Sequence, residues 1–149
     1  MKEDMKRTIL SMLVAVLFPL LGWAQSGLHV NAVFEGKVVP QGKLVEVKVR
    51  GRTLSKYRLT FYHSVRTLAT PRQKAEIDRL VNLDKQSATG SELRKKNSAQ
   101  SLILSLPSSG RTYRYLCYLV SGEGSYTGIT LVYMEGSVSS IDELRKLIN

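Results

Sequence analysis

Residues Ile129–Ile148 have the sequence ITLVYMEGSVSSIDELRKLI, which combines a strand, a glycine break and a helix in one short unit. Ser140 and Glu143 have the spacing of a capping box, in which each side chain accepts a hydrogen bond from the backbone amide of the other residue. The apolar residues that follow have helical spacing and predict one buried stripe, formed by Ile141, Leu144, Leu147 and Ile148. The stretch therefore predicts a strand that ends near Gly136 and an amphipathic helix that begins after Ser140.

The residues before the helix predict three strands in quick succession, Leu102–Leu106, Tyr113–Val120 and Thr127–Met134. Turn-forming residues separate these strands at Pro107–Gly110 and Ser121–Ser125. Because the links are short, we expect the strands to form an antiparallel meander. The middle strand is apolar along most of its length, so we expect it to be covered on both faces.

A similar order of elements is predicted for the first half of the chain. Apolar residues alternate in Leu28–Phe34, Val45–Val49 and Tyr57–Val65, which predicts three more strands. In the second of these strands we expect the valines to face the core and the charged side chains to face water. A helix is predicted next, because Thr70 is a good N-cap and Pro71 suits the first helical position.

These elements predict an α+β fold class, with an antiparallel sheet of about six strands and two helices packed on one face. The order strand, strand, strand, helix occurs twice, which suggests two βββα copies, residues 25–84 and 101–149. The polar segment KQSATGSELRKKNSAQ, residues 85–100, is predicted to be a surface loop between the copies. We expect residues 25–149 to form one domain.

The N-terminal residues predict export. A basic region precedes an apolar run, Ile9–Leu21, and small residues lie at Gly22 and Ala24. This pattern is typical of a signal peptide, here residues 1–24. The alternative is an uncleaved membrane anchor, but the run is shorter than the roughly 20 residues that a span needs. We therefore expect an exported protein that has no transmembrane anchor after cleavage.

The chain is strongly basic. Its 149 residues include 22 Lys and Arg against 12 Asp and Glu, a net charge of +10. Such a charge favours acidic partners through long-range steering. For an exported protein these partners are acidic proteins, acidic polysaccharides or lipid headgroups, and we do not expect nucleic acid. The sequence leaves open the alternative that the charge only keeps the protein in solution.

The sequence offers no convergent set of groups for catalysis. Cys117, the single cysteine, lies in an apolar run, so we expect a buried thiol rather than a nucleophile. His63 has apolar neighbours and no adjacent cluster of ligand-type residues, so we expect a core histidine rather than a metal ligand. We therefore predict no catalytic residue, no metal, no cofactor and no enzymatic activity.

The candidate binding residues are basic and aromatic. If the apolar side of the Tyr57–Val65 strand faces the core, its outer side carries Arg58, Tyr62 and Arg66. The residues expected to extend this patch from other strands are Lys48, Arg50, Arg114 and Tyr118. A second basic cluster in the predicted loop consists of Arg94, Lys95 and Lys96. Arginine and tyrosine are enriched in recognition surfaces, but they are also common on solvated sheets, and the sequence leaves both interpretations open.

Two segments carry a resemblance to a known family, GRTLSKYRLTFYHSV at Gly51–Val65 and VYMEGSVSSIDELRKLI at Val132–Ile148. Together with the leader, they resemble a family of small exported proteins from Bacteroides-type bacteria whose function is unknown. The resemblance covers the whole mature chain. It implies a protein of the Gram-negative cell envelope, periplasmic or extracellular, and it transfers no catalytic residues.

The sequence thus predicts a non-enzymatic envelope protein that binds an acidic partner or surface. The alternative is a structural accessory or inhibitor-like subunit of an envelope complex, which docks through apolar and tyrosine contacts. Salt separates the two, because electrostatic capture falls steeply by roughly 0.5 M salt whereas apolar docking persists. The sequence leaves the partner and the oligomeric state open.

Overall fold

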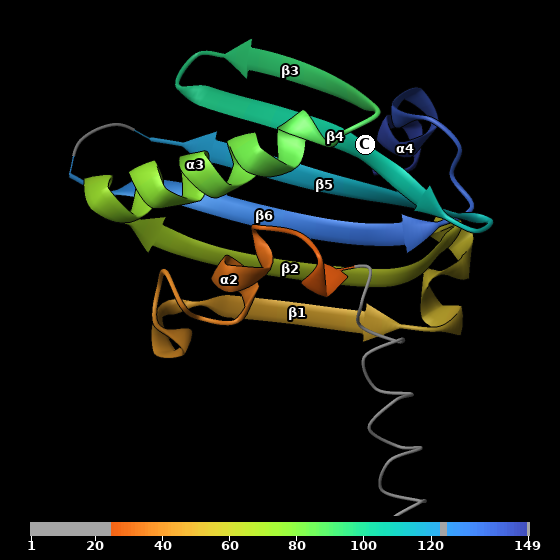
Figure 1. The fold of residues 1–149 in the computed structure, drawn as a ribbon, viewed down its shortest axis with the longest axis horizontal. Helices are drawn as coiled ribbons and strands as arrows, with labels where there is room; N and C mark the ends of the chain where they lie inside the picture. The colour runs from red at the N-terminus through yellow and green to blue at the C-terminus, as the bar shows by residue number, and fades with distance from the viewer. Residues whose placement is uncertain (1–24, 123–124, 149) are drawn as a thin grey trace, which may run out of the picture.

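A six-stranded antiparallel sheet forms the centre of the fold, with its strands in the order β1-β2-β6-β5-β4-β3 (Figure 1). The computed structural model describes residues 25–122 and 125–148, so the predicted signal peptide lies outside the described residues. The strands are β1 Val45–Arg50, β2 Leu59–Ala69, β3 Gly90–Lys96, β4 Ala99–Ser109, β5 Thr112–Ser121 and β6 Thr127–Gly136. The helices and 3-10 turns are α2 Asn31–Phe34, η1 Gln41–Lys43, η2 Arg52–Tyr57, α3 Pro71–Gln86 and α4 Ile141–Ile148.

The predicted α+β class and the antiparallel sheet are confirmed. The strands β4, β5 and β6 form the expected meander, and β6 pairs on its other edge with β2. The β2–β6 pair joins the two halves of the chain in the middle of the sheet. Within the described residues, no helix combines the length and the apolar composition needed to cross a membrane.

The helix α3 packs on one side of the sheet, as its sequence signals predict. Thr70 Oγ1 accepts a hydrogen bond from Gln73 N at 3.2 Å, and Gln73 Oε1 accepts one from Thr70 N at 3.0 Å. This reciprocal capping box satisfies two free amides of the first turn. The helix buries Ile77, Leu80 and Val81 in the larger core, and each of these side chains contributes about 2 kcal/mol before the entropy cost.

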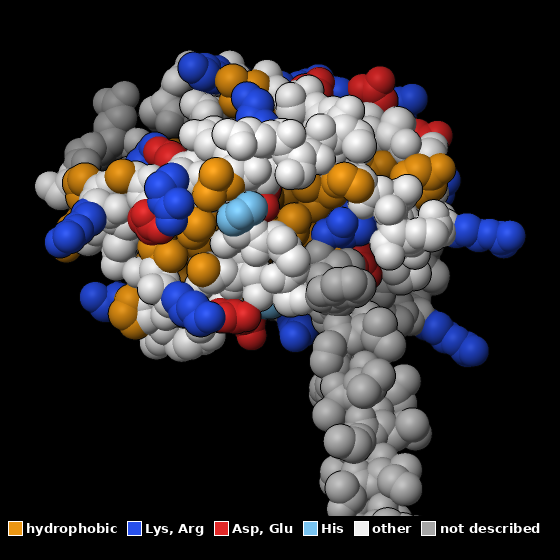
Figure 2. Space-filling view, viewed as in Figure 1, with side chains coloured by type: hydrophobic (Ala, Val, Ile, Leu, Met, Phe, Trp, Pro, Cys, Tyr) orange, Lys and Arg blue, Asp and Glu red, His pale blue; other side chains and the backbone are white. Residues whose placement is uncertain are grey.

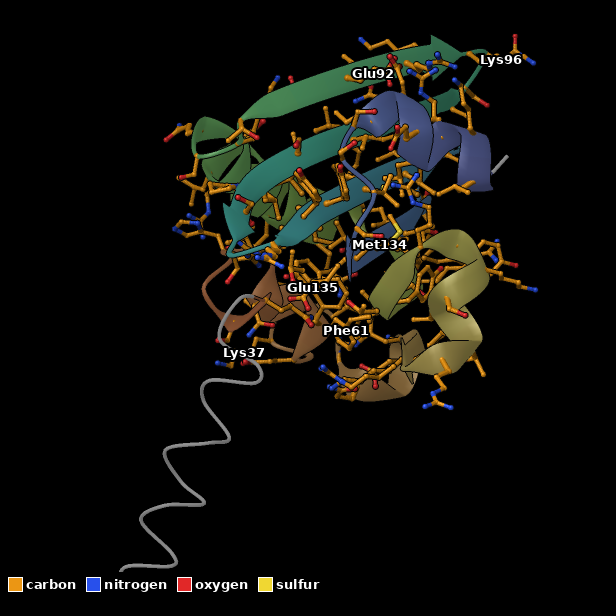
Figure 3. The ribbon with its side chains drawn as sticks, turned by 90° about the vertical axis from the view of Figure 1, so that its right-hand side faces the viewer. Lys37, Phe61, Glu92, Lys96, Met134 and Glu135 are labelled. Atoms are coloured by element: carbon orange, nitrogen blue, oxygen red, sulfur yellow. The ribbon has the colours of Figure 1, made fainter. Side chains whose placement is uncertain are left out.

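The prediction that both helices lie on one face is wrong. The helix α4 packs on the opposite side of the sheet, over a second core that contains Tyr115, Met134 and Leu144. Figure 3 shows α4 on one side of the sheet and α3 with α2 on the other. Each of the central strands is apolar on both sides, so the sheet needs a cover on both sides. The second core consists of Leu54, Leu59, Ile103, Tyr115, Cys117, Val132, Met134, Val138 and Leu144.

The first predicted strand, Leu28–Phe34, is helical instead. Its residues Asn31–Phe34 form α2, and Val30, Val33 and Phe34 are buried at the spacing of one helix face. The buried Asp84 carboxylate of α3 accepts hydrogen bonds from the amides of His29 at 2.8 Å and Val30 at 2.9 Å. A contact between distant segments therefore anchors to α3 the two residues that precede this helix.

The prediction that residues 85–100 form a surface loop is also wrong. The helix α3 extends to Gln86, and β3 then pairs along its whole length with β4. Asn97 has a φ of 56° in the two-residue turn between the paired residues Lys96 and Ala99. The observed order of the main elements is therefore ββα followed by ββββα, which differs from two βββα copies.

Candidate functional site

A row of directly opposed residues crosses all six strands on the α4 side of the sheet. Arg66 on β2 lies opposite Val45 on β1 and opposite Thr130 on β6. Leu119 on β5 is opposite Thr130 and also opposite Ser101 on β4. Ser101 is in turn opposite Arg94 on β3. We name this set the cross-sheet row, and its members in spatial order are Val45, Arg66, Thr130, Leu119, Ser101 and Arg94.

The helix α4 leaves the cross-sheet row uncovered. It packs instead over the half of this side that carries Ile103, Tyr115 and Met134. In the row, Val45 is 65% exposed and Leu119 is 40% exposed, and Arg66 and Arg94 are exposed as well. We name this uncovered half the open face; beside the row it carries Val47, Leu68, Lys96 and Tyr126.

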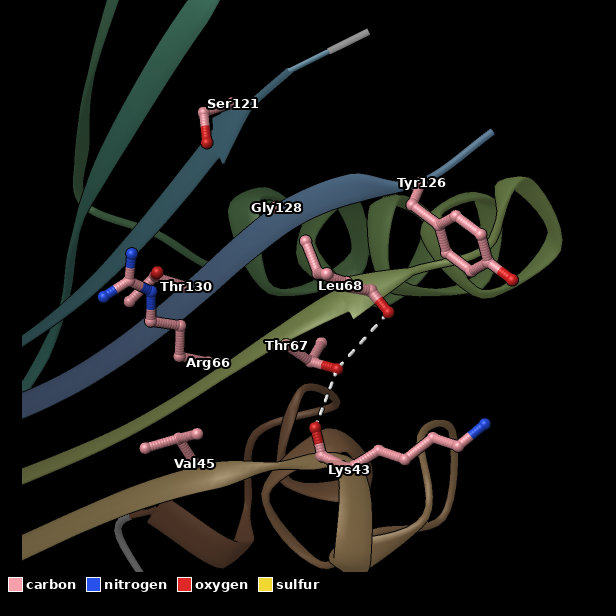
Figure 4. Close-up of a pocket in the computed structure, with 9 residues that line it drawn as sticks. All are labelled: Lys43, Val45, Arg66, Thr67, Leu68, Ser121, Tyr126, Gly128 and Thr130. Atoms are coloured by element: carbon pink, nitrogen blue, oxygen red, sulfur yellow. Dashed lines mark hydrogen bonds between the residues drawn. The ribbon is translucent and has the colours of Figure 1, made fainter. Parts of the chain in front are cut away.

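A hollow of about 790 Å³ lies at the β1–β2 end of the row (Figure 4). Arg66 and Lys43 are the cations that line it, and Leu68 and Tyr126 supply apolar surface with exposures of 69% and 60%. Thr67 Oγ1 donates to Lys43 O at 3.1 Å, which fixes the chain before β1 against β2. The hollow therefore combines a large apolar surface with a positive rim.

Further hollows continue along the row toward β3. One, of about 410 Å³, lies between Arg94, Lys96 and Leu119, and it shares Ser121 and Thr130 with the hollow at Arg66. The next, of about 420 Å³, shares Arg94, Ser101 and Leu119 with it and extends under α4 to Arg145. Neighbouring hollows share lining residues, and we name this series of adjoining hollows the groove.

Arg145 and Glu92 close the α4 end of the groove. Arg145 Nη2 lies 2.7 Å from Glu92 Oε1 and 2.7 Å from Asp142 Oδ1, and Arg94 Nε lies 3.5 Å from the same Glu92 oxygen. Glu92 Oε2 and Arg145 Nε are buried, and neither atom has a hydrogen-bond partner among the residues that the structure describes. Two arginines and two carboxylates, Glu92 and Asp142, therefore meet at this end of the groove, and their charges balance.

The structure brings together four of the six predicted binding residues. Tyr62, Arg66, Arg94 and Lys96 all line hollows of the groove, although the chain places them on two strands at different positions in the sheet. Lys95 lies on β3 opposite Gln100, so its side chain is on the α3 side of the sheet. The predicted basic loop is thus a strand that presents alternate residues to opposite faces.

Arg58 has a different position from the one predicted. It ends η2 with a φ of 60°, and its side chain contacts Glu143 Oε2 at 3.4 Å and Ser137 O at 3.2 Å. These contacts hold the connection between β6 and α4. Arg58 therefore stabilises the fold and lies outside the cross-sheet row.

The predicted extension of the patch is wrong. Lys48 and Arg50 lie opposite His63 and Phe61, which places them on the α3 side of the sheet. Arg114 donates to the hydroxyl of Tyr133 at 3.0 Å on that same side. Tyr118, also predicted to extend the patch, is buried under α3, and its hydroxyl donates to Asp78 Oδ1 at 2.5 Å.

The orientation of β1 explains the positions of Lys48 and Arg50, because the valines of this strand lie on the α4 side of the sheet and its charged residues lie on the α3 side. Figure 2 shows the side that carries α2 and α3, where cations are dispersed among acidic side chains rather than gathered in one patch. The apolar residues of the open face lie outside the predicted binding surface. The alternation of valines in β1 predicts a core-facing side, whereas Val45 and Val47 are exposed on the open face.

The buried titratable groups have structural partners. His63 lies between Gln25 Nε2 at 2.7 Å and Glu46 Oε2 at 3.0 Å, and its ring is 4.6 Å from that of Phe34. Burial lowers the pKa of His63, although the hydrogen bond to Glu46 acts in the other direction. Burial also raises the pKa of Cys117 to about 12. Across the described part of the chain, no three His, Cys, Asp or Glu residues form a group suited to a metal.

The comparisons with known proteins give a family and no further relative. No curated protein and no solved structure matches the chain. The comparison with protein families matches residues 17–148 to a family of unknown function, DUF6108. This match confirms the expected relation to a family of unknown function, and it covers both segments on which the resemblance was based. The chain belongs to the DUF6108 family.

Proposed function

We propose that this protein is a non-enzymatic binding protein and that its open face binds an acidic protein segment. The observation that supports the proposal is the cross-sheet row, which places Arg66 and Arg94 on strands four positions apart in the sheet, with the exposed side chain of Leu119 between them. Carboxylates bind arginine through charge-assisted hydrogen bonds, and the exposed apolar side chains of the groove provide burial for apolar groups of the segment.

The spacing of the two arginines sets the kind of segment that fits. They lie four strand spacings apart, which is about 19 Å for neighbouring strands in a sheet. An extended polypeptide covers this distance with about six residues. We therefore propose a segment with two acidic residues about six positions apart and apolar residues between them. A polypeptide supplies both groups, whereas a polysaccharide supplies few apolar groups for Leu68, Leu119 and Tyr126.

The location of this activity is part of the proposal. The charged and apolar pattern of residues 1–24 favours export. An exported protein in a Gram-negative cell meets its partners in the periplasm or at the cell surface, so we propose an acidic envelope protein as the partner.

A pair of matched variants tests the binding surface. The variant Arg66→Glu/Arg94→Glu/Lys96→Glu reverses three cations of the open face. Lys95→Glu reverses the one cation that lies between Arg94 and Lys96 in the chain, on the opposite side of the sheet. The probes are synthetic peptides of one composition, with two glutamates either about six positions apart or adjacent. We expect the spaced peptide to bind more tightly, and the triple variant to lose affinity on the order of tenfold or more. Lys95→Glu keeps the affinity.

Cross-linking in the native cell, followed by mass spectrometry, identifies the partner. An acidic protein cross-linked through the open face supports the proposal, and cross-links to polysaccharide or lipid alone contradict it. Equal binding of the two peptides also contradicts it.

The exposed apolar residues favour a second candidate, a structural accessory or inhibitor-like subunit of an envelope complex. Leu68, Val45 and Tyr126 are the most exposed apolar residues of the groove, at 69%, 65% and 60%. Docking through them persists above roughly 0.5 M salt, whereas capture by arginine falls steeply. Partner retention at high salt by the triple variant, together with its loss in Leu68→Ser/Tyr126→Ser, selects this candidate.

A further inference from the structure

The outer edge of β1 is open, and the charges along this strand are complementary to those of a second, antiparallel β1 strand. Among the described strands β1 pairs only with β2, so its other edge has no partner strand. Every side chain of β1 except that of Val49 is exposed, with Val45 at 65% and Val47 at 45%. An exposed edge strand is a template for pairing with another strand.

The backbone hydrogen bonds of β1 define which residues face this open edge. Gly51 N donates to Thr60 O at 3.3 Å, immediately after the paired residues Arg50 and Phe61. Bonded and non-bonded pairs alternate along an antiparallel ladder, so Val45, Val47 and Val49 bond to β2. The backbone amides and carbonyls of Glu46, Lys48 and Arg50 therefore point to the open edge.

This alternation restricts how a second copy can pair with the edge. In a two-fold pair of β1 strands, only registers that oppose Glu46, Lys48 and Arg50 to one another connect the free amides with free carbonyls. If the two-fold axis passes through Glu46, the Glu46 residues of the two copies lie directly opposite each other, and if it passes through Lys48, the two Lys48 residues do. Both registers are unfavourable, because like charges repel at directly opposed positions. An axis at Val47 opposes Glu46 to Lys48 of the second copy.

We propose that the protein forms a two-fold dimer through β1, with the axis at Val47. In this register Val45 also lies opposite Val49 of the second copy, and the two Val47 side chains meet at the axis. Opposite charges therefore pair on the α3 side, and valines pair on the open face. Lys48, which makes no ion pair within the described residues, gains a carboxylate partner. The six strands of each copy join into one continuous sheet.

The other edge strand, β3, is less suited to pairing with its own copy, because its single carboxylate, Glu92, is already bound by Arg145 Nη2 at 2.7 Å. β3 has the sequence GSELRKK, and its last three residues are cations. Antiparallel pairing of two β3 strands around these residues opposes like charges, and lysine on an edge strand is a common protection against such pairing. The β1 edge is therefore the one suited to a second copy.

The dimer extends the open face onto the second copy, but the proposal of a dimer does not depend on the proposed function. Because Val45 ends the cross-sheet row, the row continues on the second copy through Val49 and its ladder neighbour Tyr62. The two grooves then lie on one surface, and loss of peptide binding leaves the association of the two copies unchanged.

A charge exchange tests the register by sedimentation equilibrium of protein purified from its native host. We expect a dimer for the native sequence, and a dissociation constant about tenfold or more higher for Lys48→Glu, which opposes two glutamates. The double variant Glu46→Lys/Lys48→Glu restores the opposed charges and is expected to recover the dimer. Lys95→Glu makes the same charge change on the other edge strand and is expected to have no effect. A monomeric native protein, or an unchanged constant for Lys48→Glu, overturns the proposal.

A disulfide test keeps the proposal falsifiable if the double variant fails to fold, since Glu46 also bonds to His63. Two Val47→Cys residues meet at the axis, so oxidised glutathione is expected to link the copies covalently. Val45→Cys is the matched control, because its opposite residue is Val49 and not a second cysteine. Equal cross-linking of the two variants overturns the register.

Discussion

Gly136 lies against the backbone of Arg58 so closely that no Cβ atom fits at position 136. A Cβ atom there would be 2.8 Å from Leu59 Cα and nearer still to the carbonyl oxygen of Arg58. The same carbonyl accepts a hydrogen bond from Ser137 N at 2.9 Å, and the pairing of β2 with β6 shifts register at this point, between Leu59 and Phe61. Gly136 therefore allows the end of β6 to pack directly against the backbone of Arg58 and Leu59, and this contact positions the connection to α4.

Replacing Gly136 with alanine is expected to lower the free energy of unfolding by about 3 kcal/mol, because the added methyl group meets rigid backbone. Urea unfolding followed by circular dichroism measures the change. Gly42→Ala is the control, since nothing lies within 4 Å of a Cβ at that position, and it is expected to change stability by less than about 0.5 kcal/mol. Equal stability of the two variants contradicts the tight contact.

Tyr118→Phe tests the connection between the sheet and α3. The Tyr118 hydroxyl is buried and donates to Asp78 Oδ1 at 2.5 Å. Its loss removes a hydrogen bond to a carboxylate, and we expect a decrease of about 2 kcal/mol in the free energy of unfolding. Tyr126→Phe removes a hydroxyl from a side chain that is 60% exposed, and it serves as the control with little expected change. A Tyr118→Phe protein as stable as this control contradicts the prediction.

The sequence predicts the elements whose signals are local. The capping residue Thr70 is where the pattern places it, and Glu143 N donates to Ser140 Oγ at 3.1 Å. The second half of the Ser140 box differs, because the Glu143 carboxylate accepts from Ser139 N and from Ser139 Oγ rather than from Ser140 N. Local spacing thus predicts that a helix begins here, and the three-dimensional contacts decide which amide the glutamate binds.

The errors arise where distant contacts decide the structure. The segment around Val30, Val33 and Phe34 satisfies both the strand and the helix period, and Asp84 selects the helix from 54 positions away. β3 is largely exposed and has no alternation of apolar residues that would predict a strand. The remaining sequence signal is Asn97, a residue type that tolerates the positive φ of 56° found in the hairpin turn. The cross-sheet row depends on the spatial order of the strands, which the sequence did not predict.

His63 is expected to make the stability depend on pH. Burial lowers its pKa below the ordinary 6.5 in the folded protein, with Glu46 opposing this shift and Lys48 adding to it. As the pH falls below 6.5, the unfolded chain therefore binds the proton before the folded protein does. The contribution of His63 to the free energy of unfolding is therefore complete above about pH 6.5. It decreases as the pH falls from 6.5 to the pKa of His63 in the folded protein.

Urea titrations between about pH 5 and pH 8 measure this dependence. His63→Gln is expected to remove the part of the pH dependence that this residue contributes. A wild-type curve that parallels the His63→Gln curve over this range contradicts the assignment.

Cys117 is expected to be unreactive in the folded protein, although it lines the hollow next to Arg94. Burial raises the pKa of its thiol from 9.0 to about 12, and only the thiolate reacts with iodoacetamide. At pH 8 about one thiol in ten thousand is ionised, so labelling of the native protein is expected to be negligible and to become complete in urea. Leu93→Cys adds a thiol at a side chain that is 48% exposed, away from the β1 edge, and serves as the positive control. Rapid native labelling of Cys117 would show that the floor of the groove opens, and the rigid spacing between Arg66 and Arg94 would then no longer select the length of the bound segment.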